Sequence, residues 1–103
     1  MDAKVLYSGS ESDGEILTDR SFGLSNRLLA LLTDEMRGKH ALPWIEEMLE
    51  EEDMTFYPSE SRLLLDEVKS LGRKYPANAE LEELTRFVAA SLLKDKTIYV
   101  WLD

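Results

Sequence analysis

The chain has no cysteine among its 103 residues, only three prolines, and no long apolar run. The absence of cysteine excludes disulfides, thiolate nucleophiles and cysteine-ligated zinc. The longest apolar runs, such as Ile98–Leu102, are far shorter than the roughly 20 residues that a membrane-spanning helix needs. The first residues, Met1–Lys4, lack the cationic start and apolar stretch of a secretory signal. We therefore expect a soluble protein of the cytoplasm that does not bind membranes.

Motifs of catalysis are missing as well. The sequence has no metal-ligand histidine spacing, no phosphate-binding glycine loop and no nucleophile motif. The single histidine, His40, lies in a basic linker and is expected to be a solvated loop residue. In the polar segment 8–15, a calcium loop would place Gly9 at the first ligand position and Arg20 at the last, which excludes calcium. We predict no enzyme activity, no cofactor and no metal.

Basic residues are also scarce. The chain has 12 Lys and Arg against 21 Asp and Glu, which gives a formal charge of −9. Thirteen of the acids but only five of the bases lie in the first 58 residues. This charge disfavours nucleic acid and anionic lipid, which both need a cationic surface. It favours a basic protein partner, because complementary fields speed encounter and exclude wrong partners. The same charge also serves solubility, which needs no partner.

The most unusual stretch is Trp44–Pro58, which holds six acids and no base. If this stretch is helical, Glu46/Glu50 and Glu47/Glu51 are like-charge pairs four residues apart, each costing about 0.2–0.5 kcal/mol. The acids also crowd the negative end of the helix dipole. Charges that destabilise their own helix, with no nearby base to offset them, are expected at functional sites. We predict a partner-binding surface, for which the alternative is a merely solvated acidic face; its residues are Glu46, Glu47, Glu50, Glu51, Asp53, Phe56 and Tyr57.

The two aromatic residues of that set have a second interpretation. Phe56 and Tyr57 follow the acids directly and would supply the desolvated anchors that charge alone lacks. Core packing is the competing role, and for at least one of the two it is the favoured one.

Residue patterns predict three strands and four helices. The strands are Val5–Tyr7, Met54–Tyr57 and the apolar Thr97–Leu102, and segment 8–15 is an exposed loop followed by a short extended piece at Ile16 and Leu17. Helices are expected from Leu24 to a stop at Gly38, from Pro43, after a cap at Ser59 or Ser61, and after a cap at Asn78.

The predicted fold is therefore α+β and mainly helical. We expect a single domain over residues 1–103, with about four helices packed around a small three-stranded sheet in the order β-α-α-β-α-α-β. The C-terminal strand has bulky side chains on both faces, so it should pair with the Val5 strand. The alternative is a nearly all-α bundle with one short hairpin.

In its element order, size and acidity the chain resembles the barstar family of intracellular ribonuclease inhibitors. The terminal strand Thr97–Leu102 has a counterpart in that family, and an acidic helical surface there faces the enzyme. The Gly-Glu-Asn and Trp-Asp signature of the family is absent, and Pro43–Glu47 stands in its place. No residue role is therefore carried over. More broadly, the chain is similar to the immunity proteins of bacteriocin and contact-dependent growth-inhibition systems.

That resemblance implies a cognate toxin, commonly a nuclease, that is neutralised by tight binding. A nuclease site is cationic because it holds phosphates, and an acidic helix can occupy it as a phosphate substitute. The leading hypothesis is an immunity or antitoxin protein that inhibits a basic toxin. The alternatives are a phage-type nucleic-acid mimic that blocks a host nucleic-acid-binding protein, and a general protein-interaction domain.

Overall fold

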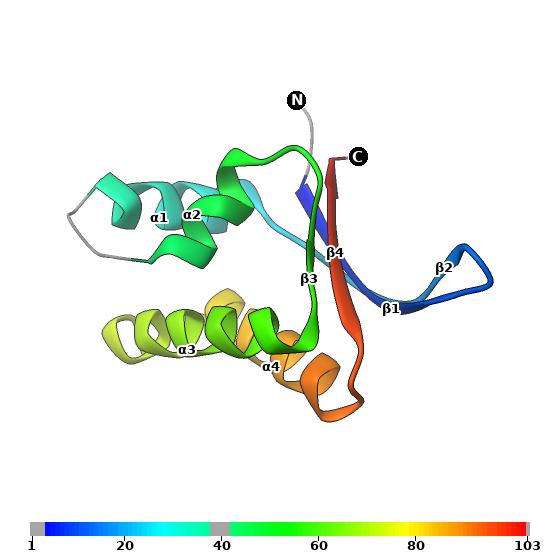
Figure 1. Ribbon diagram of the computed structural model, residues 1–103. Helices are drawn as coiled ribbons and strands as arrows, with labels where there is room; N and C mark the ends of the chain where they lie inside the picture. The colour runs from blue at the N-terminus through cyan, green and yellow to red at the C-terminus, as the bar shows by residue number, and fades with distance from the viewer. Residues whose placement is uncertain (1–3, 38–41, 103) are drawn as a thin grey trace.

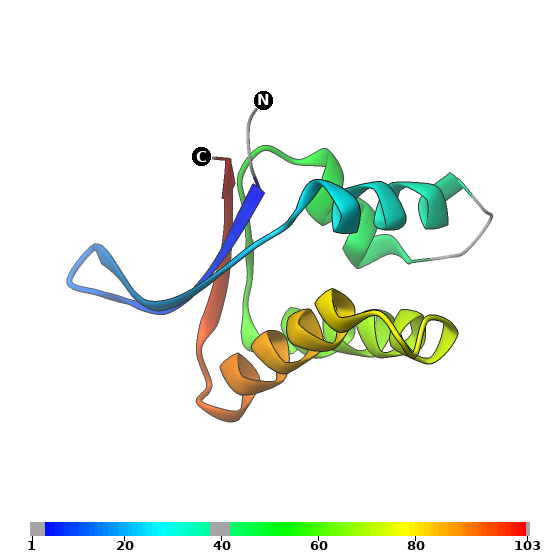
Figure 2. The same ribbon diagram turned by 180° about the vertical axis from the view of Figure 1, so that it is seen from behind.

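The computed structural model describes residues 4–37 and 42–102. One antiparallel sheet carries the helices on a single side, as Figures 1 and 2 show from opposite directions. The predicted α+β class and four helices are confirmed within this range, and the all-α alternative is wrong. The elements are β1 (Lys4–Ser12), β2 (Glu15–Gly23), α1 (Asn26–Arg37), α2 (Pro43–Glu50), β3 (Met54–Phe56), α3 (Pro58–Lys74), α4 (Ala79–Leu93) and β4 (Thr97–Leu102).

The sheet has four strands rather than the predicted three, in the order β2-β1-β4-β3. Strand β4 lies inside the sheet, where Val100 pairs with Leu6 of β1 on one side and Met54 of β3 on the other. The predicted pairing of the first strand with the C-terminal strand is confirmed. The interior position fits the buried middle of β4, where Ile98, Tyr99 and Val100 are paired on both sides.

The extra strand arises because the prediction of an exposed loop over residues 8–15 is wrong. This segment forms the far half of a hairpin, in which Ser12 pairs with Glu15. The turn residues Asp13 and Gly14 both have positive φ, at 52° and 80°. Asp-Gly favours such two-residue turns, because they match the twist of paired strands. The register shifts at Gly9, where an added Cβ would lie 2.1 Å from the Leu17 carbonyl oxygen.

The helix boundaries differ from the predicted ones at two starts. Helix α1 begins at Asn26, two residues after the predicted Leu24. Helix α3 begins at Pro58, before either predicted cap. Its first turn is completed by Glu60, whose carboxylate accepts a hydrogen bond from the Tyr57 backbone N–H at 3.1 Å. The predicted Asn78 cap of α4 is confirmed, since its side chain accepts from Leu81 N–H at 3.0 Å. The predicted stop at Gly38 and the linker with His40 lie outside the described residues.

The core forms between the sheet and the helices as one apolar cluster. Every strand and helix except the exposed β2 contributes a fully or nearly fully buried side chain. Five polar or charged residues are also buried, and every buried side-chain N or O atom in the described chain has a hydrogen-bond partner. The largest core side chains are Leu6, Leu28, Leu32, Ile45, Met48, Phe56, Leu64, Leu81, Leu84 and Ile98.

Candidate functional site

The acidic stretch forms helix α2 and the loop that leads into β3. Its six acids, Glu46, Glu47, Glu50, Glu51, Glu52 and Asp53, are all exposed. The apolar face of α2 is buried through Ile45 and Met48, so the helical period directs the acids outward. Within residues 4–37 and 42–102, none of these carboxylates takes part in an ion pair. No described base forms an ion pair with the acidic surface, although Lys4 lies within electrostatic reach of Glu51 and Asp53.

Helix α2 ends at Glu50. Glu51 is the C-terminal cap and has an extended backbone, with φ −81° and ψ 141°. The Glu51 N–H still donates to the Glu47 carbonyl oxygen at 3.0 Å, so Glu47 and Glu51 keep the predicted spacing of one turn, as Glu46 and Glu50 do within the helix.

Lys4 of β1 binds the C-terminal end of α2. Its ammonium donates to the backbone carbonyl oxygens of Met48 at 2.5 Å, Leu49 at 3.1 Å and Glu51 at 2.7 Å. A cation in this position satisfies carbonyl groups that the last turn leaves open and opposes the negative end of the dipole. The inference that the acids crowd an uncompensated helix end is thus corrected: the compensation comes from a residue 44 positions away from Met48.

The pKa of Lys4 reflects two opposing influences. The residue is only 6% exposed. Burial lowers the pKa of Lys4 because it removes water from the ammonium, and the negative charges of Glu51 and Asp53 act in the opposite direction. Two acids of the predicted partner surface therefore help to keep a buried lysine charged.

Glu67 of α3 binds the opposite end of α2. Its carboxylate accepts hydrogen bonds from the backbone N–H groups of Trp44 at 3.1 Å and Ile45 at 3.0 Å. The helix needs this contact because its cap residue, Leu42, has no side-chain acceptor. Burial raises the pKa of Glu67, and the two backbone hydrogen bonds partly oppose that rise. An acid at the first turn and a base at the last turn both match the helix dipole.

The acids face two neighbouring directions. Glu46 and Glu50 line a shallow groove between α1 and α2, together with Arg37 and Leu49. Glu51 and Asp53 lie instead near Lys4, at the end of the sheet where β3 begins. The predicted surface is therefore a ridge that runs from the α1–α2 groove to the sheet.

The structure separates the two aromatic residues predicted as anchors. Phe56 has no exposed surface and packs against Trp44, with ring centroids 6.3 Å apart. Its predicted role in a partner surface is wrong, because strand alternation turns Met54 and Phe56 toward the helices. Tyr57, the next residue, is 59% exposed. Only Tyr57 keeps a position suited to contact a partner.

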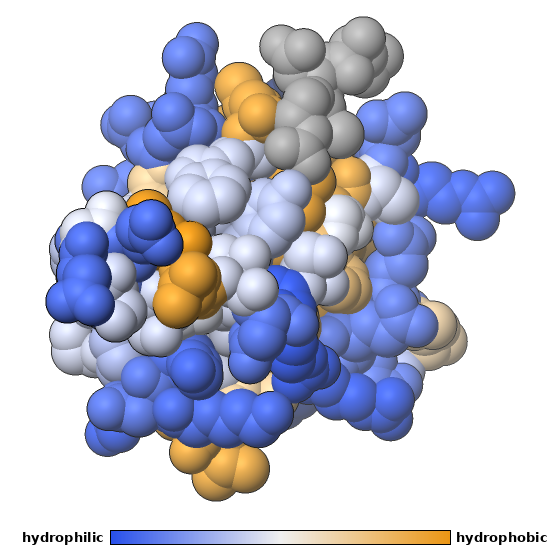
Figure 3. Space-filling model, turned by 90° about the vertical axis from the view of Figure 1, so that its right-hand side faces the viewer, coloured by the Kyte–Doolittle hydropathy of each residue, from blue (hydrophilic) through white to orange (hydrophobic). Residues whose placement is uncertain are grey.

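The bulky side chains predicted on both faces of the C-terminal strand include aromatic residues on the outer side of the sheet, which the predicted partner surface did not include. Tyr7 pairs with Tyr99, and the rings of Tyr7 and Trp101 lie 4.9 Å apart. Tyr99 and Trp101 are stacked at 5.6 Å. Successive side chains of a strand point to opposite faces of the sheet. Because Leu6 and Val100 are buried against the helices, the residues next to them in β1 and β4 point to the outer side. Figure 3 looks onto this side of the molecule, and Figure 1 shows the described helices on the other side of the sheet.

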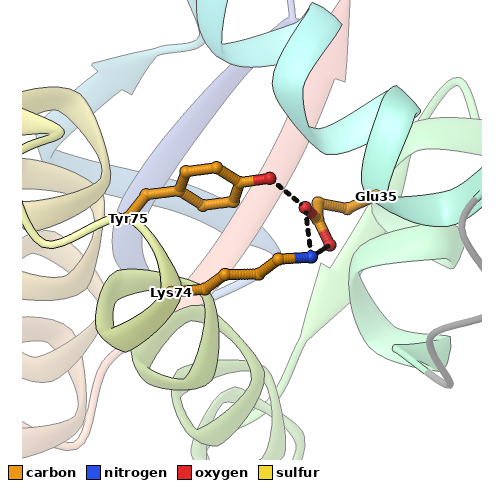
Figure 4. Close-up of polar contacts among 3 residues, drawn as sticks. All are labelled: Glu35, Lys74 and Tyr75. Carbon is orange, nitrogen blue, oxygen red and sulfur yellow. Dashed lines mark hydrogen bonds and ion pairs between the residues drawn. The ribbon is translucent and has the colours of Figure 1, made fainter.

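A second polar cluster that sequence reasoning missed joins α1 to the end of α3 (Figure 4). The Glu35 carboxylate is 5% exposed and lies 3.0 Å from the Lys74 ammonium. It also accepts a hydrogen bond from the Tyr75 hydroxyl. Contact with Glu35 raises the pKa of both Lys74 and Tyr75. Lys74 thus pairs with Glu35 rather than with the acids of α2. Glu35 lies on the same face of α1 as Leu28 and Leu32, and this spacing indicates its buried position.

The described part of the chain offers no metal centre or membrane span. No group of three or more His, Asp or Glu side chains among these residues is arranged to hold a metal ion. None of the described helices combines the length and the apolar character needed to cross a bilayer. Comparison with protein-family models, curated proteins and solved structures finds no match to this chain.

Proposed function

We propose that this protein is an immunity or antitoxin-type inhibitor that acts in the cytoplasm by binding a basic toxin, most plausibly a nuclease. It is a binding protein rather than an enzyme. The supporting observation is that the six acids of helix α2 and the loop after it are exposed and form no ion pair with any base in residues 4–37 and 42–102, while Glu67 and Lys4 hold the two ends of the helix. Such a helix presents negative charge on a fixed backbone.

The chemistry of a nuclease site complements this surface. Nucleases bind phosphates with Lys and Arg side chains, and carboxylates presented at similar spacing compete for the same cations. A preorganised helix loses less conformational entropy on binding than a flexible acidic tail. The proposed contact residues are Glu46, Glu47, Glu50, Glu51, Asp53 and Tyr57.

Exposed carboxylates are poorly suited to catalysis. General acid catalysis by a carboxyl group needs an apolar pocket that favours the protonated form. The acids of α2 are instead open to water, where long-range attraction of a cationic surface is their main effect.

The proposal is tested by capture from the native host. The full chain, immobilised at low ionic strength, is expected to retain a basic protein with nuclease activity that elutes as salt is raised. The triple variant E46Q/E47Q/E50Q should lose that protein. The matched control E15Q/D66N/E83Q removes the same charge from exposed positions elsewhere and should retain it.

Two results would contradict the proposal. One is equal retention of the captured protein by both triple variants, because the acids of α2 would then have no special role. The other is capture of a host nucleic-acid-binding protein without toxin activity, which would favour a nucleic-acid mimic that uses the same acids.

A further inference from the structure

The outer side of the sheet carries Tyr7, Tyr99 and Trp101, and Tyr57 directly follows β3 within electrostatic reach of Tyr99; we call these four residues the aromatic face. All the described helices lie on the opposite side of the sheet (Figures 1 and 2). In Figure 3 this side shows a pale central area of intermediate hydropathy, with hydrophobic patches beside it and hydrophilic residues around it. A sheet face with this composition needs an explanation, because polar residues usually occupy the solvent side of an antiparallel sheet.

The aromatic face is a continuous layer. Tyr7 and Tyr99 are directly paired, Val5 is paired with Trp101, and the rings of Tyr7 and Tyr99 each lie within 6 Å of the Trp101 ring. Tyr99 is only 5% exposed although no helix covers it, so its neighbours on the sheet bury it. The more accessible rings are those of Trp101, which is partly exposed, and Tyr57, which is 59% exposed.

Acidic residues border this layer on two sides. The pKa of Tyr99 is raised first by burial and then by the charge of Glu11, which places Glu11 within electrostatic reach. Asp53 directly precedes Met54, and Met54 pairs with Val100, so the backbone of Asp53 comes level with Trp101. The acidic ridge of α2 therefore continues to the edge of the aromatic face.

Aromatic rings bordered by carboxylates suit one side chain above others. The arginine guanidinium is planar, stacks on aromatic faces and pairs with carboxylates. Nucleic acid also stacks on aromatic residues of sheets, but its phosphates would meet Glu11, Glu51 and Asp53. A second copy of this chain would bring another formal charge of −9 to the contact. Charge complementarity thus selects a basic protein.

We infer that the aromatic face docks an arginine-bearing segment of a basic partner protein, with Trp101 and Tyr57 stacking on guanidinium groups and Asp53 and Glu11 pairing with them. The inference rests on the proposed function and adds to it the side chain that is recognised and the second surface that recognises it. The α2 acids then attract the partner, and the aromatic face fixes it in place.

The test compares two peptides of equal charge, nona-arginine and nona-lysine, titrated into the isotopically labelled full chain and followed by NMR. Nona-arginine should bind about three- to fivefold more tightly, because guanidinium stacking adds to an otherwise equal electrostatic attraction. Its chemical-shift changes should include Trp101, Tyr57 and Tyr99. Nona-lysine should perturb mainly the acids of α2.

Variants separate stacking from charge. Tyr57→Ala and Trp101→Ala should each reduce the arginine preference toward unity while leaving nona-lysine affinity within about twofold, since neither changes the charge. Leu93→Ala is the matched control, because Leu93 is 89% exposed on α4 and should leave the preference intact. Tyr57 lies outside the core cluster, so its variant stays informative if Trp101→Ala does not fold.

Several outcomes would overturn the inference. Equal affinity for the two peptides, with shifts confined to α2, would remove the aromatic face from the interface while leaving the proposed function standing. Tighter binding of a thymidine oligonucleotide at the same residues would assign the face to nucleic acid. Concentration-dependent shifts in the protein alone would assign it to a second copy. A preserved arginine preference without capture of any toxin would instead overturn the proposed function only.

Discussion

Lys4 shows how one side chain changes the interpretation of the acidic stretch. Its ammonium is buried against three carbonyl oxygens at the end of α2, and it lies near Glu51 and Asp53. A buried cation is tolerated when hydrogen bonds and opposite charges replace its water. Part of the acidic stretch therefore supports the fold, whereas the described residues give no such contact to the other four acids, Glu46, Glu47, Glu50 and Glu52.

Replacing Lys4 by methionine keeps the length of the side chain and removes its charge. Lys4→Met should lower the free energy of unfolding by about 2–3 kcal/mol, because three carbonyl groups lose their donor. Urea unfolding at neutral pH measures the change. Lys69→Met is the control, since Lys69 is exposed on α3 and its loss alters net charge equally. A difference below about 0.5 kcal/mol between the two variants would contradict the capping role.

Glu67 gives a pH-dependent prediction. Its folded pKa is raised above the ordinary value of 4.5, so the folded state binds its proton more tightly than the unfolded state. The stability from this group is present below pH 4.5 and is lost as pH rises through the folded pKa. The stability of wild type relative to Glu67→Gln should therefore decline as pH is raised from 4 to 7. Paired urea titrations check this, and a rising difference would contradict it.

At the scale of the element, the β1–β2 hairpin depends on its backbone. Gly9 sits at the register shift, where a Cβ would collide with the Leu17 carbonyl. Gly72, in contrast, lies in α3 with open space around the position of a Cβ. The two glycines thus differ in what an added methyl group would meet.

Substitution by alanine should therefore have opposite effects at the two positions. Gly9→Ala should destabilise the fold by about 2 kcal/mol or more, since the strand pair must shift. Gly72→Ala should stabilise it by about 0.5–1 kcal/mol through helix propensity. Thermal unfolding of both variants gives the comparison. An unchanged stability of Gly9→Ala would contradict this prediction, because the hairpin would then accept the added methyl group without losing stability.

Elements with strong local signals were predictable from sequence. The alternation in Thr97–Leu102, the Asn78 cap and the apolar stripe of α1 each gave the correct element. The far half of the hairpin was missed because the end of β1 and nearly all of β2 are exposed, although Asp13-Gly14 carried the turn signal. The contacts of Lys4 and Glu67 with α2 join residues more than 20 positions apart, which no local pattern encodes. Burial of Phe56 was likewise decided by tertiary packing.

At the scale of the whole molecule, helices and exposed acids are arranged around one sheet. The helical layer holds the core, and the acidic ridge leads from the α1–α2 groove to the aromatic face. The two surfaces have different physical effects, since charge acts over about 10 Å in dilute salt and stacking acts only at contact. Association and final affinity should therefore respond to different residues.

Neutralising the ridge should also affect stability. In E46Q/E47Q/E50Q the like-charge pair Glu46/Glu50 is lost and the negative end of the dipole is relieved. The free energy of unfolding should rise by about 0.5–1 kcal/mol. Urea unfolding beside E15Q/D66N/E83Q measures it. A loss of stability would mean that these acids support the fold, in the way that Glu51 and Asp53 do near Lys4.

The central claim is that the α2 acids attract a cationic partner, and the association rate constant tests it most directly. Stopped-flow mixing of the captured basic protein with wild type and E46Q/E47Q/E50Q at low ionic strength gives that rate. The triple variant should associate at least about tenfold more slowly, and the difference should vanish at high salt. Equal rates for wild type, this variant and E15Q/D66N/E83Q at low salt would contradict the claim.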